Sequence, residues 1–338
     1  MTTRRLFLRR VPQTLLVALG VGLVAFGITR LLPGDAASTW AGPRASLEEL
    51  ALVREQLGLD RPLPEQVVSY LVGLVQGDWG ISIHTRQPVL DDVLGRLVAS
   101  LELVGMAMLI ALSVGILLGM AGARWKGRWP DWITSGVTAV LVSAPIFWLG
   151  LLLQLTVATE LDLLPVAGRF DREYRDAVAE QSLTGLLLID SVLALNGPLF
   201  ASSLTHVLLP ALVVAAYPTG LIARLFRAAL IETLGEEHVR MVRAIGFPER
   251  TILWRYALRP SLGPVLAALA LVFGYALGNT FLVENLFNWP GLGSYVVDSI
   301  STLDAPSIAG ATVIVALAYL VANLAVDLIR PVVDPRLR

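Results

Sequence analysis

Cysteine and histidine, two residue types that often carry out chemistry on a substrate, are absent or scarce in this 338-residue chain. Cysteine is absent, which excludes disulfides and thiolate metal sites. The three histidines, His84, His206 and His238, are far apart, and none has a zinc-site spacing such as H-E-x-x-H. The sequence therefore predicts no catalytic residue and no metal site. A membrane enzyme is the least supported class, because no nucleophile and base are clustered.

The single lysine bears on ATP chemistry. Lys126 precedes a glycine in "WKGR", whereas a phosphate-binding P-loop needs a lysine followed by Ser or Thr. The chain alone is therefore not expected to hydrolyse ATP. If ATP drives its activity, the ATPase is another polypeptide, and part of this chain must bind it.

One stretch stands out by its charge, "EEHVRMVRAIGFPERTILWRYALRP", from Glu236 to Pro260. Residues Glu236–Ile245 fit one short helix, which Gly246 can end because glycine adopts positive φ without steric cost. Pro248 can open a second helix, and Pro260 is expected to stop it. This predicts two short helices joined by a bend.

Both predicted helices are amphipathic. The apolar stripes are Val239, Val242 and Ile245 on the first helix and Ile252, Leu253, Tyr256 and Ala257 on the second. The arginines lie off these stripes at 240, 243, 250, 255 and 259. Each helix is only roughly 15 Å long and carries charges that are costly in lipid, so the pair is expected to lie on the membrane surface.

The rest of the chain must place this element, and its composition is that of a multi-pass membrane protein. The chain is 55% hydrophobic and 16% charged, whereas soluble domains carry about 25% charged residues. The net charge of −1 gives no sign of nucleic-acid binding. Six apolar stretches are long enough to cross a bilayer: Val11–Leu32, Leu97–Ala123, Trp132–Thr159, Val207–Leu230, Leu262–Phe287 and Ile308–Ile329.

Arginine and lysine fall mainly on one side of these predicted spans. One alternating set of connections holds most of the 26 basic residues, at 4, 5, 9, 10, 124, 126, 128, 224, 227, 240, 243, 250, 255, 259, 330, 336 and 338. The positive-inside rule makes this set cytoplasmic, with both termini and the stretch 236–260 inside. A rival interpretation takes "TRRLFLRR" as a twin-arginine export signal, but an uncleaved first helix is favoured.

The centres of the six predicted spans carry no Asp, Glu, His or Lys, which disfavours a proton-coupled carrier. Polar residues such as Gln154, Asn279 and Asn323 could face a water-filled path or bond neighbouring helices. The stretch 236–260 then has three interpretations. Its arginines could fix topology and contact anionic lipid, it could be a DNA-binding helix–turn–helix, or it could couple the chain mechanically to a partner.

Three outside connections complete the sequence. In 33–96, Ser46 and Glu49 form a predicted capping box for the helix in "SLEELALVREQLG", in a region that is either a surface cap or a docking surface. In 160–206, the apolar piece that contains Asp190 is expected to lie at the membrane interface rather than to span the membrane. In "ENLFNWPGLGSYVVDSISTLDAP", the turn-forming residues favour either an ordinary connection or a short re-entrant element that helps to close a pore. The candidate external-gate residues there are Trp289, Pro290, Gly291 and Gly293.

The stretch "EEHVRMVRAIGFPERTILWRYALRPSLGPVL" resembles the cytoplasmic coupling loop of binding-protein-dependent ABC importer permeases. More narrowly, the chain is similar to the first permease subunit of dipeptide/oligopeptide/nickel importers. The likeness continues in "EQLGLDRPLPEQ", "GDWGIS", "RLVASLEL", "SAPIFWLGLLL", "HVLLPAL", "VENLFNWPGLGSYVVDSI" and the ending "VDPRLR". Where the wider superfamily has Glu-Ala-Ala, this chain has Arg240-Met241-Val242, so no role is assigned to an acidic residue there.

The resemblance implies an all-α membrane protein with the type I ABC importer permease fold, six transmembrane helices and both termini cytoplasmic. It implies residues 1–96 as a first helix plus an extracytoplasmic amphipathic region, 97–331 as the core domain with the coupling loop at about 232–260, and 332–338 as a tail. The implied location is the bacterial cytoplasmic (inner) membrane. The residues expected to contact the ATPase are Arg240, Arg243, Ala244, Gly246, Phe247, Arg250 and Tyr256.

The resemblance also implies that the chain lies in the lipid bilayer and has three kinds of protein partner. These are a second homologous permease, two ABC ATPase domains and an extracytoplasmic substrate-binding protein, with ATP and magnesium bound by the ATPase subunits and no cofactor on this chain. The expected cargo is a peptide, with nickel, haem or another small solute as alternatives and a stand-alone ion-coupled carrier as a further one. The sequence predicts no substrate-binding residues.

Overall fold

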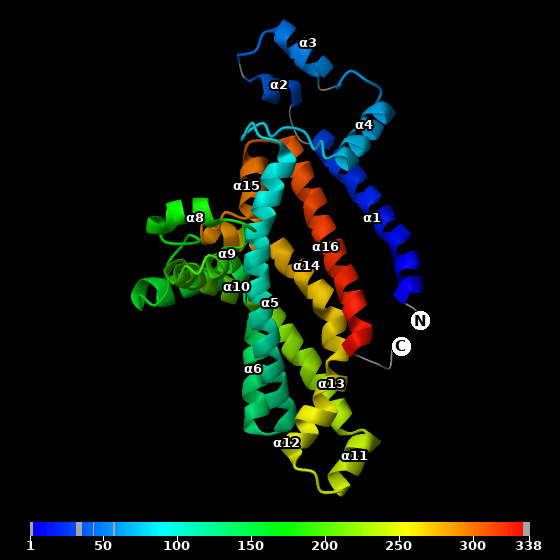
Figure 1. The fold of residues 1–338 in the computed structure, drawn as a ribbon, viewed down its shortest axis with the longest axis vertical. Coiled ribbons are helices and arrows are strands. Elements are labelled where there is room, and N and C mark those ends of the chain that lie inside the picture. The colour runs from blue at the N-terminus through cyan, green and yellow to red at the C-terminus, as the bar shows by residue number, and fades with distance from the viewer. Residues whose placement is uncertain (1–2, 32–35, 43, 57, 334–338) are drawn as a thin grey trace. The chain divides into compact units, whose positions relative to one another are not determined.

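The structure is a computed structural model that describes residues 3–31, 36–42, 44–56 and 58–333. Within these ranges the chain is helical, with one isolated bridge between Ile81 and Pro88 and no strand (Figure 1). The α-helices are α1 Thr3–Leu31, α2 Ala36–Ala41, α3 Leu47–Gln56, α4 Leu63–Gln76, α5 Val89–Arg124, α6 Trp129–Ser143, α7 Ile146–Leu153, α8 Arg175–Gln181, α9 Leu187–Leu193, α10 Gly197–Leu234, α11 Glu237–Ala244, α12 Glu249–Thr251, α13 Leu258–Ser261, α14 Gly263–Leu286, α15 Leu292–Ser301 and α16 Ala305–Val333. Two π-helical segments, η1 Gln154–Glu160 and η3 Ile252–Ala257, and a 3-10 turn, η2 Arg172–Tyr174, complete the described elements.

The chain divides into two compact units. The larger unit comprises Leu101–Trp289 and Val321–Arg338 with Met1–Thr3, and the smaller unit comprises Arg4–Ser100 and Pro290–Leu320. The predicted division into 1–96, 97–331 and 332–338 followed the order of the sequence, so it does not coincide with these units. Residues 334–338 of the predicted tail lie outside the described residues.

The core of the larger unit is built around α10, which packs against α6, α9 and α14. Most of the middle of α10 is buried, including Leu209, Ile222 and Phe226. Gly220 lets α10 approach α6 closely, because a Cβ there would lie 2.9 Å from the carbonyl oxygen of Thr138. Close packing at small residues is a common way to associate membrane helices.

Among the described residues, four helices are long and apolar enough to cross a membrane. They are Val89–Arg124, Gly197–Leu234, Gly263–Leu286 and Ala305–Leu328, and each covers one of the six predicted spans to within one residue at either end. The first predicted span lies in α1, whose described apolar part, Leu16–Leu31, is shorter. The number six and the sidedness of the termini remain predictions.

The third predicted span, Trp132–Thr159, is not one straight helix. The structure breaks it into α6 and a second helix, Ile146–Glu160, which are bent by 106° relative to each other. The break falls at Ala144, whose backbone is extended, and Pro145, which caps the second helix. Proline biases the residue before it away from helical angles, which explains a break that the uninterrupted apolar composition concealed.

The smaller unit confirms the predicted capping box. The backbone N–H of Ser46 donates to Glu49 Oε2 at 2.7 Å, and the backbone N–H of Glu49 donates to Ser46 Oγ at 3.2 Å, at the start of α3. These hydrogen bonds lower the pKa of Glu49. A small core joins α1 to α16 in this unit, with Ala25, Ala309 and Val313 buried together.

Candidate functional site

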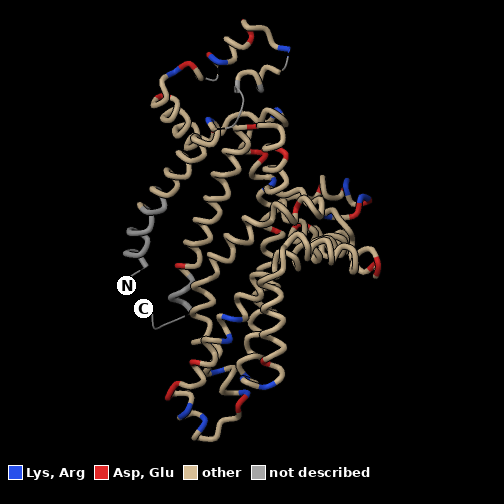
Figure 2. The backbone as a smooth tube through the Cα atoms, turned by 180° about the vertical axis from the view of Figure 1, so that it is seen from behind, with Lys and Arg blue, Asp and Glu red and all other residues tan. Residues whose placement is uncertain are grey.

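The charged stretch forms two helices joined at Gly246, as predicted. The first, α11, ends at Ala244, and Gly246 has a φ of +93° with nothing within 4 Å of the position where a Cβ would lie. The second begins at Glu249 with Pro248 as its cap and continues through η3 into α13. In Figure 2, charged residues of the larger unit gather in this helix–turn–helix, whereas the middles of the long helices are almost free of them.

The turn is closed by an ion pair between its two sides. Arg243 Nε donates to Glu249 Oε1 at 2.6 Å, and an Arg243 terminal nitrogen donates to Glu249 Oε2 at 3.2 Å. These side-chain hydrogen bonds hold the pKa of Glu249 below its ordinary value and raise that of Arg243. Arg243, predicted to contact a partner, is therefore bonded within the loop, and Glu249 is a site residue that the prediction omitted.

The inner face of the element is packed on the body of the larger unit. Val239, Ile252 and Ala257 are fully buried. The buried hydroxyl of Ser261 donates to that of Thr233 at 3.1 Å, which links α13 to the last turn of α10. The helix–turn–helix is therefore anchored at its base to α10, and α13 leads almost directly into α14.

The outer face exposes apolar side chains. Met241, Ile245, Phe247 and Trp254 are 63%, 69%, 41% and 53% exposed, and the predicted contact residues Arg240, Ala244 and Arg250 are exposed beside them. The ring of Phe247 meets the half-buried ring of Tyr256 edge-on at 5.9 Å. Aromatic, methionine and arginine side chains are the types enriched at protein–protein interfaces, so this surface is suited to binding a protein.

Two details of the predicted loop differ from the structure. Ile245, predicted to share an apolar face with Val239, is exposed whereas Val239 is buried, because α11 ends one residue earlier and the chain turns outward there. Pro260 does not stop its helix, which runs to Ser261. The π-helical register of η3 precedes this proline, and wider pairing of this kind accommodates its missing N–H.

A basic hollow lies beside the turn. It has a volume of about 420 Å³ and is lined by Arg124, Trp125, Lys126, Arg128, Leu234, Arg243, Glu249 and Leu253. Asp131, in the first turn of α6, accepts from the N–H of Gly127 in this basic connection at 2.9 Å and from Arg227 Nε of α10 at 2.7 Å. The basic connection is therefore linked to α10 through Asp131.

Of the candidate external-gate residues, Trp289 lies in the larger unit and is 1% exposed. The guanidinium of Arg169 lies 5.6 Å from the centre of its ring, and Arg169 Nε also donates to Glu102 Oε2 at 2.9 Å. The neighbouring Phe287 carbonyl accepts a hydrogen bond from the N–H of Gly168 at 2.8 Å. Trp289 is therefore packed under the connection 160–196, an arrangement that sequence spacing could not reveal.

Pro290, Gly291 and Gly293 lie in the smaller unit at the start of α15. Gly291 is extended and Gly293 is buried, so the left-handed residue of this turn is Asn288, with a φ of +48°. Neither glycine has a positive φ, and the left-handed position is occupied by asparagine, which also tolerates this conformation. The start of α15 is instead fixed by Ser100 Oγ, which accepts from the N–H of Leu292 at 2.7 Å.

Within the part of the chain that the structure describes, no group of three or more His, Asp or Glu side chains could hold a metal ion. The observed features are instead those of an integral membrane protein with an exposed apolar surface on a charged helix–turn–helix. Comparison with known proteins identifies the class. The family described as "Binding-protein-dependent transport system inner membrane component" matches residues 112–338. The chain belongs to this permease family. Its N-terminal companion family matches residues 3–104.

Individual relatives of this permease agree along nearly the whole chain. The probable D,D-dipeptide transport system permease protein DdpB of Escherichia coli (strain K12) is 41% identical over 322 residues, which is 95% of this chain and 94% of the relative. The dipeptide transport system permease protein DppB of the same strain is 35% identical, with 98% of each chain covered. The glutathione transport system permease protein GsiC of Salmonella choleraesuis (strain SC-B67) is 33% identical, with 97% and 95% covered.

These matches confirm the resemblance on which the sequence prediction rested. The chain is a multi-pass permease component of a bacterial inner membrane. The boundary between the two matched families, near residues 104 to 112, lies within α5. The Gly246 turn lies in the part of the chain that the main family matches.

Proposed function

We propose that this permease forms half of the translocation path of an ATP-driven importer of peptides. Its partners are a second, homologous permease, two ABC ATPase domains and an extracytoplasmic substrate-binding protein. The chain itself is non-catalytic, and ATP and magnesium are bound by the ATPase subunits. The relatives named for dipeptides and for glutathione, itself a small peptide, support this substrate class.

The observation that carries the proposal is the exposed apolar surface of the helix–turn–helix. Met241, Ile245 and Trp254 are each more than half exposed on an element that carries arginines and cannot enter lipid. Exposed apolar patches rimmed by polar residues mark protein–protein contacts. A cytoplasmic ATPase with an apolar groove is the partner that this surface fits.

The base of the element supports a mechanical role. An ATPase that moves α11 and α12 also moves α10 and α14, because Val239, Ile252 and Ser261 are packed on the same unit. The Arg243–Glu249 pair keeps the two arms in a fixed relation, so that displacement is transmitted rather than absorbed in the turn. Arg240, Ala244, Phe247 and Arg250 are the proposed contact residues at the tip.

The proposed topology has six spans and cytoplasmic termini, with α6 and the bent helix after it forming one broken span. On the outer side, Trp289 with Pro290, Gly291 and Gly293 serves as the external gate. Arg169 supports this role through its contacts with the Trp289 ring and with Glu102.

The Gly246→Arg variant tests the coupling role. The added side chain imposes a positive-φ strain of about 1–2 kcal/mol and places a bulky charge in the ATPase interface. In proteoliposomes containing the two permeases, the ATPases and the binding protein, the variant is expected to reach the membrane and assemble. Dipeptide uptake should fall at least tenfold, while ATP hydrolysis is no longer stimulated by loaded binding protein.

Gly42→Arg is the matched control. Gly42 also has a positive φ, of 90°, and open space around it, but it lies outside the helix–turn–helix. It should retain uptake. Normal uptake by Gly246→Arg, or uptake by the permease alone without ATP, would overturn the proposal and favour a stand-alone carrier.

A further inference from the structure

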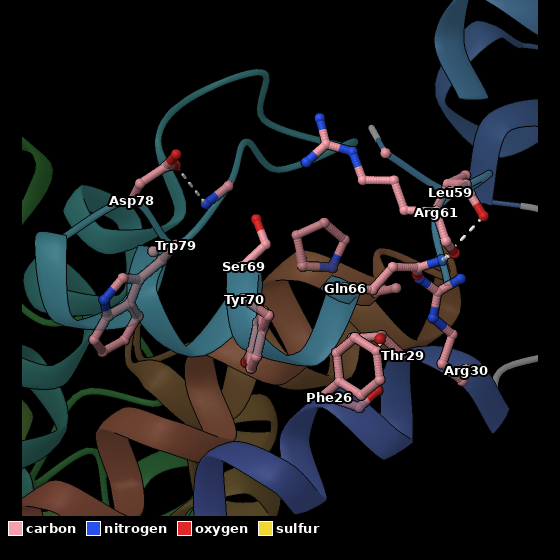
Figure 3. Close-up of a pocket in the computed structure, with 15 residues that line it drawn as sticks. Phe26, Thr29, Arg30, Leu59, Arg61, Gln66, Ser69, Tyr70, Asp78 and Trp79 are labelled. Atoms are coloured by element: carbon pink, nitrogen blue, oxygen red, sulfur yellow. Dashed lines mark hydrogen bonds between the residues drawn. The ribbon is translucent and has the colours of Figure 1, made fainter. Parts of the chain in front are cut away.

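The smaller unit contains a cavity of about 310 Å³ that the proposed transport function does not use (Figure 3). Its walls are the last turns of α1, the turn that precedes α4, α4 itself and the start of α16. Phe26 and Arg30 come from α1, Arg61 from the turn, and Gln66 and Tyr70 from α4. All of these belong to the same compact unit.

Two buried polar atoms in this cavity lack partners among the described residues. The amide nitrogen of Gln66 donates to the carbonyls of Leu59 at 3.0 Å and Arg61 at 2.6 Å, but its Oε1 accepts nothing. The hydroxyl of Tyr70 is also unpaired, and burial raises its pKa to about 12, so it remains protonated. Gln66 is only 9% exposed, and leaving such groups unbonded costs about 1–3 kcal/mol each. The cavity therefore suits a ligand that both donates and accepts hydrogen bonds.

The charged groups around the cavity favour an anion. Figure 3 shows the Arg30 side chain beside Gln66 and the Arg61 side chain extending across the opening. Arg30 lies 5.3 Å from the Phe26 ring, and neither arginine has a carboxylate partner among the described residues. Asp78 faces them, but one of its oxygens accepts from the N–H of Gly80. The lining thus carries two positive charges and one negative charge.

An exposed apolar stripe continues from the cavity along α4. Val68, Val72 and Val75 are 61%, 46% and 90% exposed, and their spacing of four and three residues places them on one face. They line an apolar groove of about 370 Å³. A further groove, which Glu65 also lines, shares Arg61 and Asp78 with the cavity and Val68 and Val72 with the stripe, so the path from the charged pocket to the valines is continuous.

The other face of α4 packs on apolar parts of α1 and α16. Leu74 packs on the cluster formed by Ala25, Ala309 and Val313, which belong to the apolar parts of α1 and α16. A Cβ on Gly22 of α1 would lie 2.9 Å from Leu71. Because α4 packs along apolar transmembrane surface, the valine stripe on its outer side is expected to face acyl chains rather than water.

We propose that this cavity and the valine stripe together bind one anionic phospholipid from the leaflet at which α1 ends. The phosphate lies between Arg30 and Arg61, headgroup hydroxyls bond Gln66 and Tyr70, and an acyl chain follows Val68, Val72 and Val75. Phosphatidylglycerol has the required features, namely one negative charge, a phosphodiester and free hydroxyls. With the topology proposed above, this is the extracytoplasmic leaflet. The site does not depend on which solute is transported.

The test is native mass spectrometry of the detergent-purified importer complex, supplied with phosphatidylglycerol or phosphatidylcholine of equal chain length. The wild type is expected to retain one more phosphatidylglycerol than the Arg30→Gln/Arg61→Gln variant and no corresponding phosphatidylcholine. Loss of two charge contacts should lower the apparent affinity about thirtyfold. Arg61→Gln alone, at an exposed position, should give a smaller loss and guards against a folding defect in the double variant.

Further measurements test whether the bound anion is a lipid rather than free phosphate, and whether the arginines bind a lipid rather than the substrate-binding protein. Val72→Asn/Val75→Asn should also reduce lipid retention, because the acyl chain loses its apolar surface. The matched control Arg44→Gln/Arg175→Gln, which removes two exposed arginines outside the cavity, should retain the lipid. The proposal is overturned if millimolar inorganic phosphate displaces the lipid. It is equally overturned if retention is the same in wild type and Arg30→Gln/Arg61→Gln while affinity for the substrate-binding protein falls.

Discussion

At the scale of single residues, the Gly246 turn depends on one backbone conformation and one ion pair. Gly246 has a φ of +93°, which other L-residues adopt at a cost of about 1–2 kcal/mol. Arg243 and Glu249 then bridge the two sides of the turn. Both side chains are about half exposed, so the pair adds less than about 1 kcal/mol to global stability. Its role is to restrict the loop rather than to stabilise the fold.

Glu249→Gln is therefore expected to affect local motion more than unfolding. The folded-state pKa of Glu249 lies below its ordinary value of 4.5, so its contribution is present above pH 4.5 and disappears as the pH falls through the folded pKa. At pH 7 the variant should increase hydrogen exchange in peptides covering 242–250 while the melting temperature changes by at most 2 °C. The swapped pair Arg243→Glu/Glu249→Arg should restore protection. Unchanged exchange in Glu249→Gln would contradict this role.

At the scale of elements, α5 and α10 approach closely at glycines. A Cβ on Gly119 would lie 2.7 Å from the carbonyl oxygen of Ala223, and one on Gly115 would lie 3.1 Å from that of Thr219. A backbone atom of a packed helix cannot move aside as the end of a flexible side chain can. The close approach of α5 to α10 therefore requires glycine at these two positions.

Gly119→Ala should consequently separate the two helices and destabilise the permease by roughly 1–3 kcal/mol, the usual cost of overpacking. Gly105→Ala, in the same helix and with nothing within 4 Å, is the matched control and should be neutral or slightly stabilising through helix propensity. The measurement is the thermal unfolding midpoint of both purified variants. Equal midpoints for the two would show that the close approach does not constrain the packing.

The Asp131–Arg227 pair joins α6 to α10, and its partners differ in exposure. The Asp131 side chain is 9% exposed and that of Arg227 is 31% exposed. Asp131→Asn leaves a partly buried guanidinium without its counter-charge and should cost about 1–3 kcal/mol. The double variant Asp131→Asn/Arg227→Gln should be more stable than the single one, because it removes the uncompensated charge. The thermal unfolding midpoints of the two variants test this order of stability. A double variant less stable than Asp131→Asn would contradict the prediction that the unpaired guanidinium causes the loss.

The sequence predicted those features whose determinants are local. Ser46 and Glu49 lie three residues apart, and Gly246 followed by Pro248 marks a bend whatever surrounds it. The Asp131–Arg227 contact spans 96 positions and depends on how α6 packs against α10, which the sequence alone does not encode in any local pattern. The break at Pro145 was hidden by an apolar composition that satisfied the length of one span.

The helix–turn–helix likewise combines features that the local sequence predicts with features that it does not predict. The predicted apolar stripe of Ile252, Leu253, Tyr256 and Ala257 follows from helical periodicity, and in the structure Tyr256 is half-buried and the other three residues are buried. The exposure of Ile245 and the pairing of Arg243 with Glu249 could not be derived, because both depend on the position at which α11 ends. A shift of one residue at a helix end changes which side chains are free for a partner.

At the scale of the whole molecule, the distribution of charge predicts a membrane topology. Because the chain has no cysteine, single-cysteine variants can test this topology. Basic residues concentrate in the connections 124–128 and 235–260, whereas 160–182 mixes acidic and basic residues. The proposed orientation requires the bent pair α6 and Ile146–Glu160 to cross the membrane as one broken span. A re-entrant loop would instead return the chain to its starting side.

Single-cysteine variants distinguish these two paths, since exposed positions flank each crossing. Lys126→Cys and Glu237→Cys should react only with a maleimide that reaches the cytoplasm, and Asp176→Cys should react with an impermeant maleimide added to intact cells or spheroplasts. If the bent pair were re-entrant, Asp176→Cys would share the sidedness of Lys126→Cys. Glu237→Cys would then react from the opposite side, because α10 is long enough to cross once. That pattern would place the Gly246 turn outside, away from any ATPase, and would contradict both the positive-inside assignment and the coupling role.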